Sequence, residues 1–234
     1  MAFQSNQLSK KLSEEDLINK IREQVHKNKF LSEGTGGYHI RRGMAHSVSG
    51  YCEDIFALYV AQYLNNKKLN FYVDKVISTK FEGKKRSTSF KPDLAIVDEN
   101  NVLTHYFDIK TNLGWNRHLE NYLYNKEEFI ASLRLHGKAW ITSKPSWLEK
   151  ENEKGETISF NNKYPLPNLQ HLTVSENLKY HIVVVFGSNI NADKMEENYQ
   201  IVKLLKNVEL NVLSHKERIV QDSFDSIHRS LDLL

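Results

Sequence analysis

The chain has 234 residues, of which 40% are hydrophobic and 26% charged, as in an ordinary globular protein rather than a disordered or fibrous one. Its formal net charge of +3 is too small to indicate a nucleic-acid partner unless basic residues gather locally. Because Cys52 is the single cysteine, an intrachain disulfide and a zinc site built of thiolates are excluded.

Helix-like and strand-like patterns alternate along the chain. Ser13 followed by three acids is typical of a helix start, and the apolar spacing after Cys52 is typical of a helix with one buried side. The expected helices are 13–29, one that begins at about 52, 118–135, 192–206 and 222–234. The expected strands are 70–79, two that form a hairpin within 92–110, 137–142, 179–187 and 208–214.

This order of elements predicts an α/β protein of the α+β type, with a mixed central sheet flanked by helices. We find no internal repeat and no low-complexity tract, so a single domain over 1–234 is expected. Residues 30–50 and 80–91 are predicted loops that are rich in basic residues. Residues 143–178 show little periodicity, and so long an irregular stretch in a compact domain is usually functional or mobile.

The sequence PDLAIVDENNVLTHYFDIK, residues 92–110, predicts a β-hairpin with its turn at 98–101. In this register Asp93 faces Tyr106. Because side chains alternate between the two faces of a strand, one face receives all three ionisable side chains at the open end, which are Asp93, Asp108 and Lys110. The other face receives Leu94, Ile96, Leu103, Phe107 and Ile109.

These three side chains suit the metal-dependent hydrolysis of phosphodiesters. Asp93 and Asp108 would be diagonal neighbours with Cα atoms about 7–8 Å apart, close enough to hold one Mg²⁺. The cation would polarise a phosphate and lower the pKa of a bound water, which Lys110 would hold. Glu53, in the first turn of the second helix, would supply a third acid. The alternative is a solvated polar end of a sheet, because Asp-x-Lys and Pro-Asp are common sequences.

Three short sequences resemble the motifs of one nuclease superfamily. GYCEDIFALYV contains Glu53, FKPDLAIV contains Pro92-Asp93, and YFDIKTN contains Asp108-Ile109-Lys110; they look like the E, PD and D-x-K elements of the PD-(D/E)xK nucleases. The resemblance covers roughly residues 47–142, and the restriction endonucleases of that superfamily are similar in size to this chain.

The resemblance implies a restriction-endonuclease-like core with the active site at one end of the central hairpin. It implies that Asp93 and Asp108 are Mg²⁺ ligands and that Lys110 orients the attacking water. Glu53 would be an auxiliary acid and a further metal ligand, with Glu33 and Asp54 as competitors for that place.

Basic and amide side chains near the hairpin are candidate DNA contacts. The two basic loops carry Arg41, Arg42, Lys84, Lys85 and Arg86, which would bind phosphates without regard to sequence. Asn112, Asn116 and Arg117 follow the hairpin and are residue types that read base edges. Residues 143–178 are a second candidate, as a DNA-reading insertion. For each of these residues, the alternative is ordinary solvation of a surface loop.

The sequence therefore predicts a Mg²⁺-dependent endonuclease that cuts double-stranded DNA at a short specific site, as the type II enzyme of a restriction-modification system does. A homodimer is expected, because two-fold symmetry matches the two strands of a duplex. The apolar stripe Phe224, Ile227, Leu231 and Leu234 is either its interface or part of the core. The alternatives are a structure-specific repair or recombination nuclease of the same superfamily, and a noncatalytic DNA-binding protein on that fold.

Other classes of protein lack their motifs in this sequence. There is no phosphate-binding loop and no dinucleotide-binding glycine pattern, so no nucleotide cofactor is expected. The N-terminal residues lack the apolar core of a signal peptide, and the longest apolar run, 182–186, is too short to span a bilayer. We therefore expect a cytoplasmic protein with no membrane partner.

Overall fold

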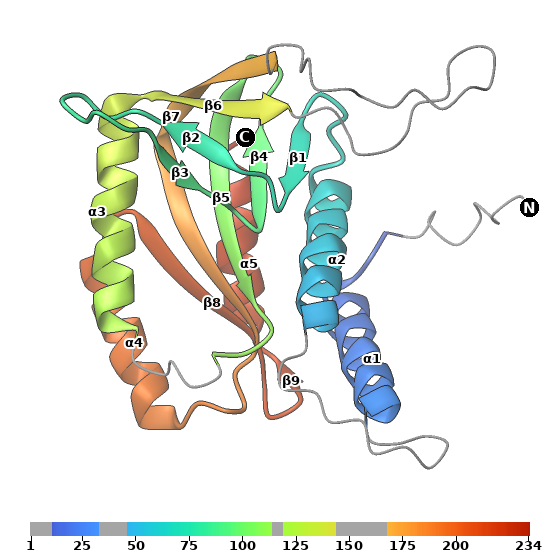
Figure 1. Ribbon diagram of the computed structural model, residues 1–234. Helices are drawn as coiled ribbons and strands as arrows, with labels where there is room; N and C mark the ends of the chain where they lie inside the picture. Colours follow the sequence, from blue (N-terminus) through green and yellow to red (C-terminus); the bar gives the residue numbers. More distant parts are fainter. Residues whose placement is uncertain (1–10, 33–45, 114–118, 144–167) are drawn as a thin grey trace, which may run out of the picture.

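The computed structural model describes residues 11–32, 46–113, 119–143 and 168–234 (Figure 1). In this part of the chain five helices flank one mixed sheet of nine strands, which confirms the predicted fold class. The helices are α1 (Glu14–Ser32), α2 (His46–Leu64), α3 (Glu120–His136), α4 (Ala192–Leu204) and α5 (Gln221–Leu231). The strands are β1 (Asn70–Val73), β2 (Ile77–Thr79), β3 (Thr88–Phe90), β4 (Leu94–Val97), β5 (Val102–Lys110), β6 (Lys138–Ser143), β7 (Asn168–Phe186), β8 (Val208–His215) and β9 (Arg218–Ile219).

β7 organises the sheet, because its 19 residues pair with different strands along its length. On one side it pairs with β5, in parallel. On the other side its first half pairs with β6 in antiparallel orientation and its second half with β8 in parallel orientation. The strand order is β1-β4-β5-β7-β6-β2-β3, with β8 and β9 beyond the second half of β7. Figure 1 shows β7, in orange, curving along the whole length of the sheet.

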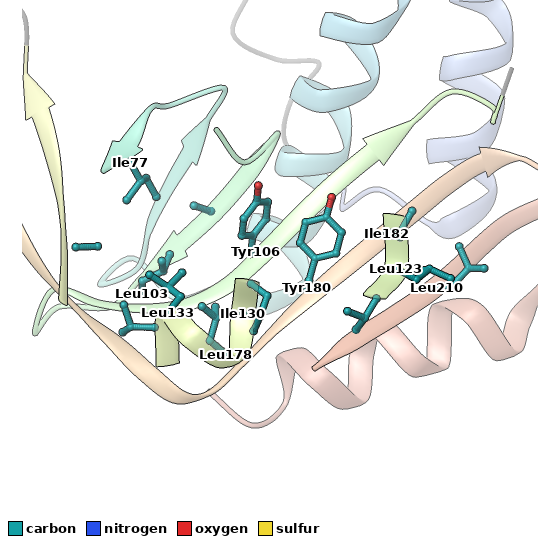
Figure 2. Packing of buried hydrophobic residues seen from close by; sticks show 14 of the residues in the cluster. Ile77, Leu103, Tyr106, Leu123, Ile130, Leu133, Leu178, Tyr180, Ile182 and Leu210 are labelled. Atoms are coloured by element: carbon teal, nitrogen blue, oxygen red, sulfur yellow. The ribbon is translucent and has the colours of Figure 1, made fainter. Parts of the chain in front are cut away.

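Helices cover both faces of the sheet, so the β4–β5 hairpin is buried on both sides. α1, α2 and α5 pack on one face, where Phe56, Phe107 and Phe224 are fully buried. α3 and α4 pack on the other face, where α3 contributes Leu123, Ile130 and Leu133 (Figure 2). Asp93, Asp108 and Lys110 therefore lie at one end of the face that α3 and α4 cover, and not on an exposed face of the sheet.

The hairpin register differs from the predicted one. Ala95, not Asp93, pairs with Tyr106, so the same register places Asp93 directly opposite Asp108. The last paired residues are Leu94 and Phe107, and beyond them the Asp93 N–H donates to the Phe107 carbonyl at 3.1 Å, so the two strands stay hydrogen-bonded at this point. The predicted diagonal arrangement of the two aspartates was wrong, and direct opposition brings the carboxylates closer.

A tight loop and a β-bulge cause this difference. The Asp98 N–H donates to the Val102 carbonyl at 3.0 Å, and the register shifts between Ile96 and Val97. Together they move the pairing by two residues, which is one full period of a strand, so the face of each aspartate is unchanged. Leu103 lies beyond the bulge and packs in the core under α3, so its predicted place beside Phe107 was wrong.

Several predicted boundaries also differ. α2 begins at His46 rather than at about 52, because Ser and Gly in its first turns resemble a loop in sequence. The single strand predicted over 70–79 is two strands, separated at Asp74, which adopts a φ of 53°. The predicted loop 80–91 contains β3.

The region predicted to be irregular, 143–178, is in part a regular strand. Ser143 ends β6, and 168–178 forms the first part of β7, where the Thr173 N–H donates to the Asn101 carbonyl at 3.0 Å. Residues 144–167 lie outside the described residues, so the predicted DNA-reading insertion stays a prediction for that segment.

The C-terminal stripe belongs to the core of the chain itself. Phe224, Ile227 and Leu231 are completely buried in the core beneath α5, whereas Leu234 is 46% exposed. The first three side chains are therefore not available to form a dimer interface. None of the helices in the described residues combines the length and the apolar character that crossing a membrane requires.

Candidate metal and phosphodiester site

Three predicted site residues meet where β4 begins and β5 ends. Lys110 Nζ lies 2.7 Å from Asp108 Oδ1 and 4.0 Å from Asp93 Oδ2. The carboxylates are mostly buried, with 12% of the Asp108 side chain and 16% of the Asp93 side chain exposed, whereas 42% of Lys110 is exposed. The Ile109 N–H donates to Asp93 Oδ2 at 2.6 Å and fixes that side chain. The structure brings the three residues together, and their chemical roles stay a prediction.

Two buried carboxylates that lie side by side repel each other when both are ionised, and this repulsion destabilises the folded state. Burial, followed by the negative charge of Asp108, raises the pKa of Asp93 to about 7. Burial also acts to raise the pKa of Asp108, but the Lys110 ammonium and hydrogen bonds from Lys110 and Tyr122 outweigh it and hold this pKa below its usual range. Asp93 therefore keeps a proton at mildly acidic pH and donates it in a hydrogen bond to the ionised Asp108.

Two further acids lie beside Asp93: Glu53 of α2, which was predicted from the sequence, and Asp74, which was not. Carboxylate oxygens of Glu53, Asp74 and Asp93 all lie within 4.8 Å of one another. Burial and the charge of Asp74 raise the pKa of Glu53. Asp74 follows the last residue of β1, and its N–H donates to the Asp93 carbonyl at 3.2 Å. We call Glu53, Asp74, Asp93 and Asp108 the carboxylate cluster. Asp93 lies beside Glu53 and Asp74 and also beside Asp108.

Of the two competing acids, only Asp54 is among the described residues, and it does not belong to this cluster. Asp54 is exposed on α2, and Glu33 lies outside the described residues. Asp74 was missed because it lies 19 residues before Asp93 in the sequence, and only the pairing of β1 with β4 brings the two together. An acid directly after a strand is a weak signal on its own. Lys91 Nζ forms an ion pair with Asp74 Oδ1 at 2.5 Å.

Aromatic residues of α3 and β7 form the inner wall of the site. The Tyr122 hydroxyl donates to Asp108 Oδ2 at 2.7 Å and lies 2.5 Å from the Tyr180 hydroxyl. Because Tyr122 has a single hydroxyl proton, Tyr180 must donate to Tyr122. Lys126, one helical turn after Tyr122, places its ammonium 4.7 Å from the centroid of the Tyr180 ring. Burial lowers the pKa of Lys126. None of these three residues was among the site residues predicted from the sequence.

The predicted DNA contacts are only partly within the described residues. Lys84, Lys85 and Arg86 are exposed in the turn between β2 and β3, and Lys84 also lines a cavity of about 630 Å³ between that turn and α3. Asn112 is exposed two residues after Lys110. The other predicted contacts, Arg41, Arg42, Asn116 and Arg117, lie outside the described residues.

The residues present fit a hard divalent cation. Such ions prefer carboxylate oxygens, and those of Glu53, Asp74 and Asp93 lie within 4.8 Å of one another, with Asp108 beside Asp93. The raised pKa values of Asp93 and Glu53 indicate that nearby positive charge does not fully offset the negative charge of these acids. Comparisons of this chain with protein-family models, with curated proteins and with solved structures found no match. The chemistry of the site must therefore be worked out from its own residues.

Proposed function

We propose that this protein is a Mg²⁺-dependent endonuclease that hydrolyses phosphodiester bonds of double-stranded DNA. One observation supports this most strongly: the Lys110 ammonium lies against two opposed, mostly buried carboxylates at the end of a two-stranded ladder. A surface ion pair needs only one acid and one base. A second buried carboxylate beside them raises the energy of the folded state, which a bound cation would relieve.

The residues would divide the work as follows. Asp93 and Asp108 would hold the cation, with Glu53 and Asp74 as further oxygen ligands next to Asp93. When bound, the cation polarises the phosphate and lowers the pKa of a water molecule.

Lys110 would hold the attacking water and move its proton, since a lysine has three donors on a flexible stem. Attack of this water on phosphorus breaks one P–O ester bond and leaves a phosphate monoester and a free hydroxyl. The Tyr122 hydroxyl would keep Asp108 oriented through Oδ2.

We further propose cleavage at a short specific site by a cytoplasmic homodimer, as in type II restriction. Two active sites related by a two-fold axis match the two antiparallel strands of a duplex. Lys84, Lys85 and Arg86 would contribute phosphate contacts from the β2–β3 turn, because all three are exposed. The dimer interface would lie elsewhere than the buried stripe of α5.

The test is cleavage of supercoiled plasmid and of defined duplexes in Mg²⁺. We expect discrete fragments from the wild-type protein, and losses of about 10³-fold or more for Asp108→Ala and Lys110→Ala, because each removes a group that acts on the reacting atoms. Asp193→Ala and Lys138→Ala are matched controls, since both side chains are exposed outside the cluster, and they should cut like the wild type.

The alternatives predict other outcomes of the same assay. Cleavage confined to branched or mismatched DNA would favour a repair or recombination nuclease. DNA binding without cleavage in either Mg²⁺ or Mn²⁺ would favour a noncatalytic DNA-binding protein. Wild-type rates from Asp108→Ala or Lys110→Ala would remove the proposed site altogether.

A further inference from the structure

Lys126 occupies a pocket of tyrosine rings beside the carboxylate cluster. Its Nζ lies 4.7 Å from the centroid of the Tyr180 ring, 5.3 Å from that of Tyr122 and 5.8 Å from that of Tyr106. Because Tyr122 and Lys126 are four residues apart on α3, they project from the same side of the helix. Figure 2 shows Tyr106 of β5 and Tyr180 of β7 next to each other, with both hydroxyls pointing the same way. The fold therefore fixes the place of this ammonium.

Lys126 differs from the other lysines of the site in having no acid to neutralise it. Lys91 is paired with Asp74 at 2.5 Å, and Lys110 with Asp108 at 2.7 Å. Among the described residues, no carboxylate lies within ion-pair distance of Lys126 Nζ.

The nearest acid is already engaged. Asp108 Oδ1 accepts a hydrogen bond from Lys110, and Asp108 Oδ2 accepts one from Tyr122. The aromatic rings stabilise the positive charge of Lys126 through their faces, but they leave its N–H groups without a strong acceptor. The ammonium is thus half-buried and positioned, and it can donate to an incoming anion.

A phosphodiester needs such a cation here. The carboxylates of the cluster repel an approaching phosphate. The positive charges of Lys91 and Lys110 are already partly offset by their ion pairs with Asp74 and Asp108. We propose that Lys126 binds an oxygen of the substrate phosphate that enters the site, and that Tyr106, Tyr122 and Tyr180 position its ammonium for this contact. This inference rests on the proposed function and names a second lysine contact of the same site.

The simpler role for Lys126 would be packing of its methylene stem against the tyrosines. Two substitutions separate the roles. Lys126→Met keeps an apolar stem of similar length and removes the charge, and Lys126→Arg keeps the charge. Lys126→Gln is a second neutral variant in case the methionine variant does not fold. Lys203→Met is the matched control, because Lys203 is an exposed lysine on the neighbouring helix α4.

The experiment measures the affinity of each full-length protein for a cleavable DNA duplex over a series of NaCl concentrations, with Ca²⁺ in place of Mg²⁺. We expect Lys126→Met to bind about tenfold more weakly, as for the loss of one charged hydrogen bond. The slope of log affinity against log salt should fall by about 0.9, the value for one phosphate contact. Lys126→Arg should stay within about threefold of the wild type, and Lys203→Met should equal it. Thermal unfolding of each variant checks the fold.

Wild-type affinity and salt slope in Lys126→Met or Lys126→Gln would overturn the inference, and the proposed nuclease would stand as long as the wild type cuts DNA. Equal losses in the methionine and arginine variants without a change of slope would also overturn it, in favour of stem packing. A wild-type protein that neither binds nor cuts duplex DNA would remove the proposed function and this contact together.

Discussion

Strand β5 contributes to a polar cluster on each face of the sheet, and the buried charges of the two clusters are neutralised to different extents. On the α3 side, Asp93 and Asp108 are opposed with Lys110 as their only direct ion-pair partner among the described residues. On the α5 side lies what we call the histidine cluster, which consists of His105, His181, Lys179, Glu209 and Ser230.

The histidine cluster is internally satisfied at most of its polar atoms. His105 Nε2 lies 3.1 Å from the Ser230 carbonyl, and the Ser230 hydroxyl lies 3.1 Å from His181 Nε2. Glu209 lies 3.4 Å from His181 Nδ1 and 2.5 Å from Lys179 Nζ. Both imidazole rings are buried, with His181 fully inaccessible to solvent. The arrangement forms a polar network beneath α5, in which the buried His181 Nδ1 has no hydrogen-bond partner among the described residues.

The two clusters should therefore respond to pH with opposite signs. Burial lowers the pKa of His105 to about 4 from 6.5, so this residue costs stability as the pH falls from 6.5 towards 4. The pKa of Asp93 is raised to about 7 from 3.8, so this residue costs stability as the pH rises from 3.8 towards 7. Thus the histidine cluster stabilises the fold at neutral pH, whereas the carboxylate cluster destabilises it there in the absence of a bound cation.

The largest expected effect on folding comes from opening the histidine cluster. Glu209→Ala leaves Lys179 and the buried His181 without their carboxylate, so we expect a loss of about 3 kcal/mol in the free energy of unfolding at pH 7. Urea unfolding measures it. Glu196→Ala, at an exposed glutamate of α4, is the control and should change stability by about 0.5 kcal/mol or less. DNA cleavage at low temperature should be retained; its loss would show that the two clusters are coupled.

A change of opposite sign is expected in the carboxylate cluster. Asn at position 93 can still accept from the Ile109 N–H and donate to Asp108, as the protonated aspartate does, but it has no charge. Asp93→Asn should therefore stabilise the metal-free fold by about 2 kcal/mol at pH 8. The gain should shrink as the pH falls towards 4, because wild-type Asp93 then takes up its proton. Thermal unfolding between pH 4 and 8 checks this, and a destabilised Asp93→Asn at pH 8 would contradict it.

Sequence periodicity was sufficient for the class of fold and for the core of the site. The apolar spacing in α1 and α2 marked buried helices, and the alternation in residues 92–110 placed Asp93, Asp108 and Lys110 on one face. Alternation has a period of two, so the prediction of faces survived a register error of two residues. Leu103 was misplaced because a bulge, whose extra residue is Thr104, changes the period, and no residue type at 103–105 announces it.

The remainder of the site depends on contacts between distant segments. Asp74 reaches Asp93 only through the β1–β4 pairing. Tyr122 reaches Asp108, and Lys126 reaches the Tyr180 ring, only because α3 packs on β7. No local pattern encodes these contacts. The first half of β7 was missed for another reason: residues 168–178 follow a polar segment, and their weak alternation was read as part of it.

The central claim is that the opposed Asp93–Asp108 pair is a cation site, and calorimetric titration of the metal-free protein with Mn²⁺ tests it most directly. Wild-type protein should bind the ion and release a proton at pH 6.5, since Asp93 must ionise to become a ligand. Asp93→Asn should bind at least about tenfold more weakly and without that proton release. Equal affinity and equal proton release in the two proteins would contradict the claim.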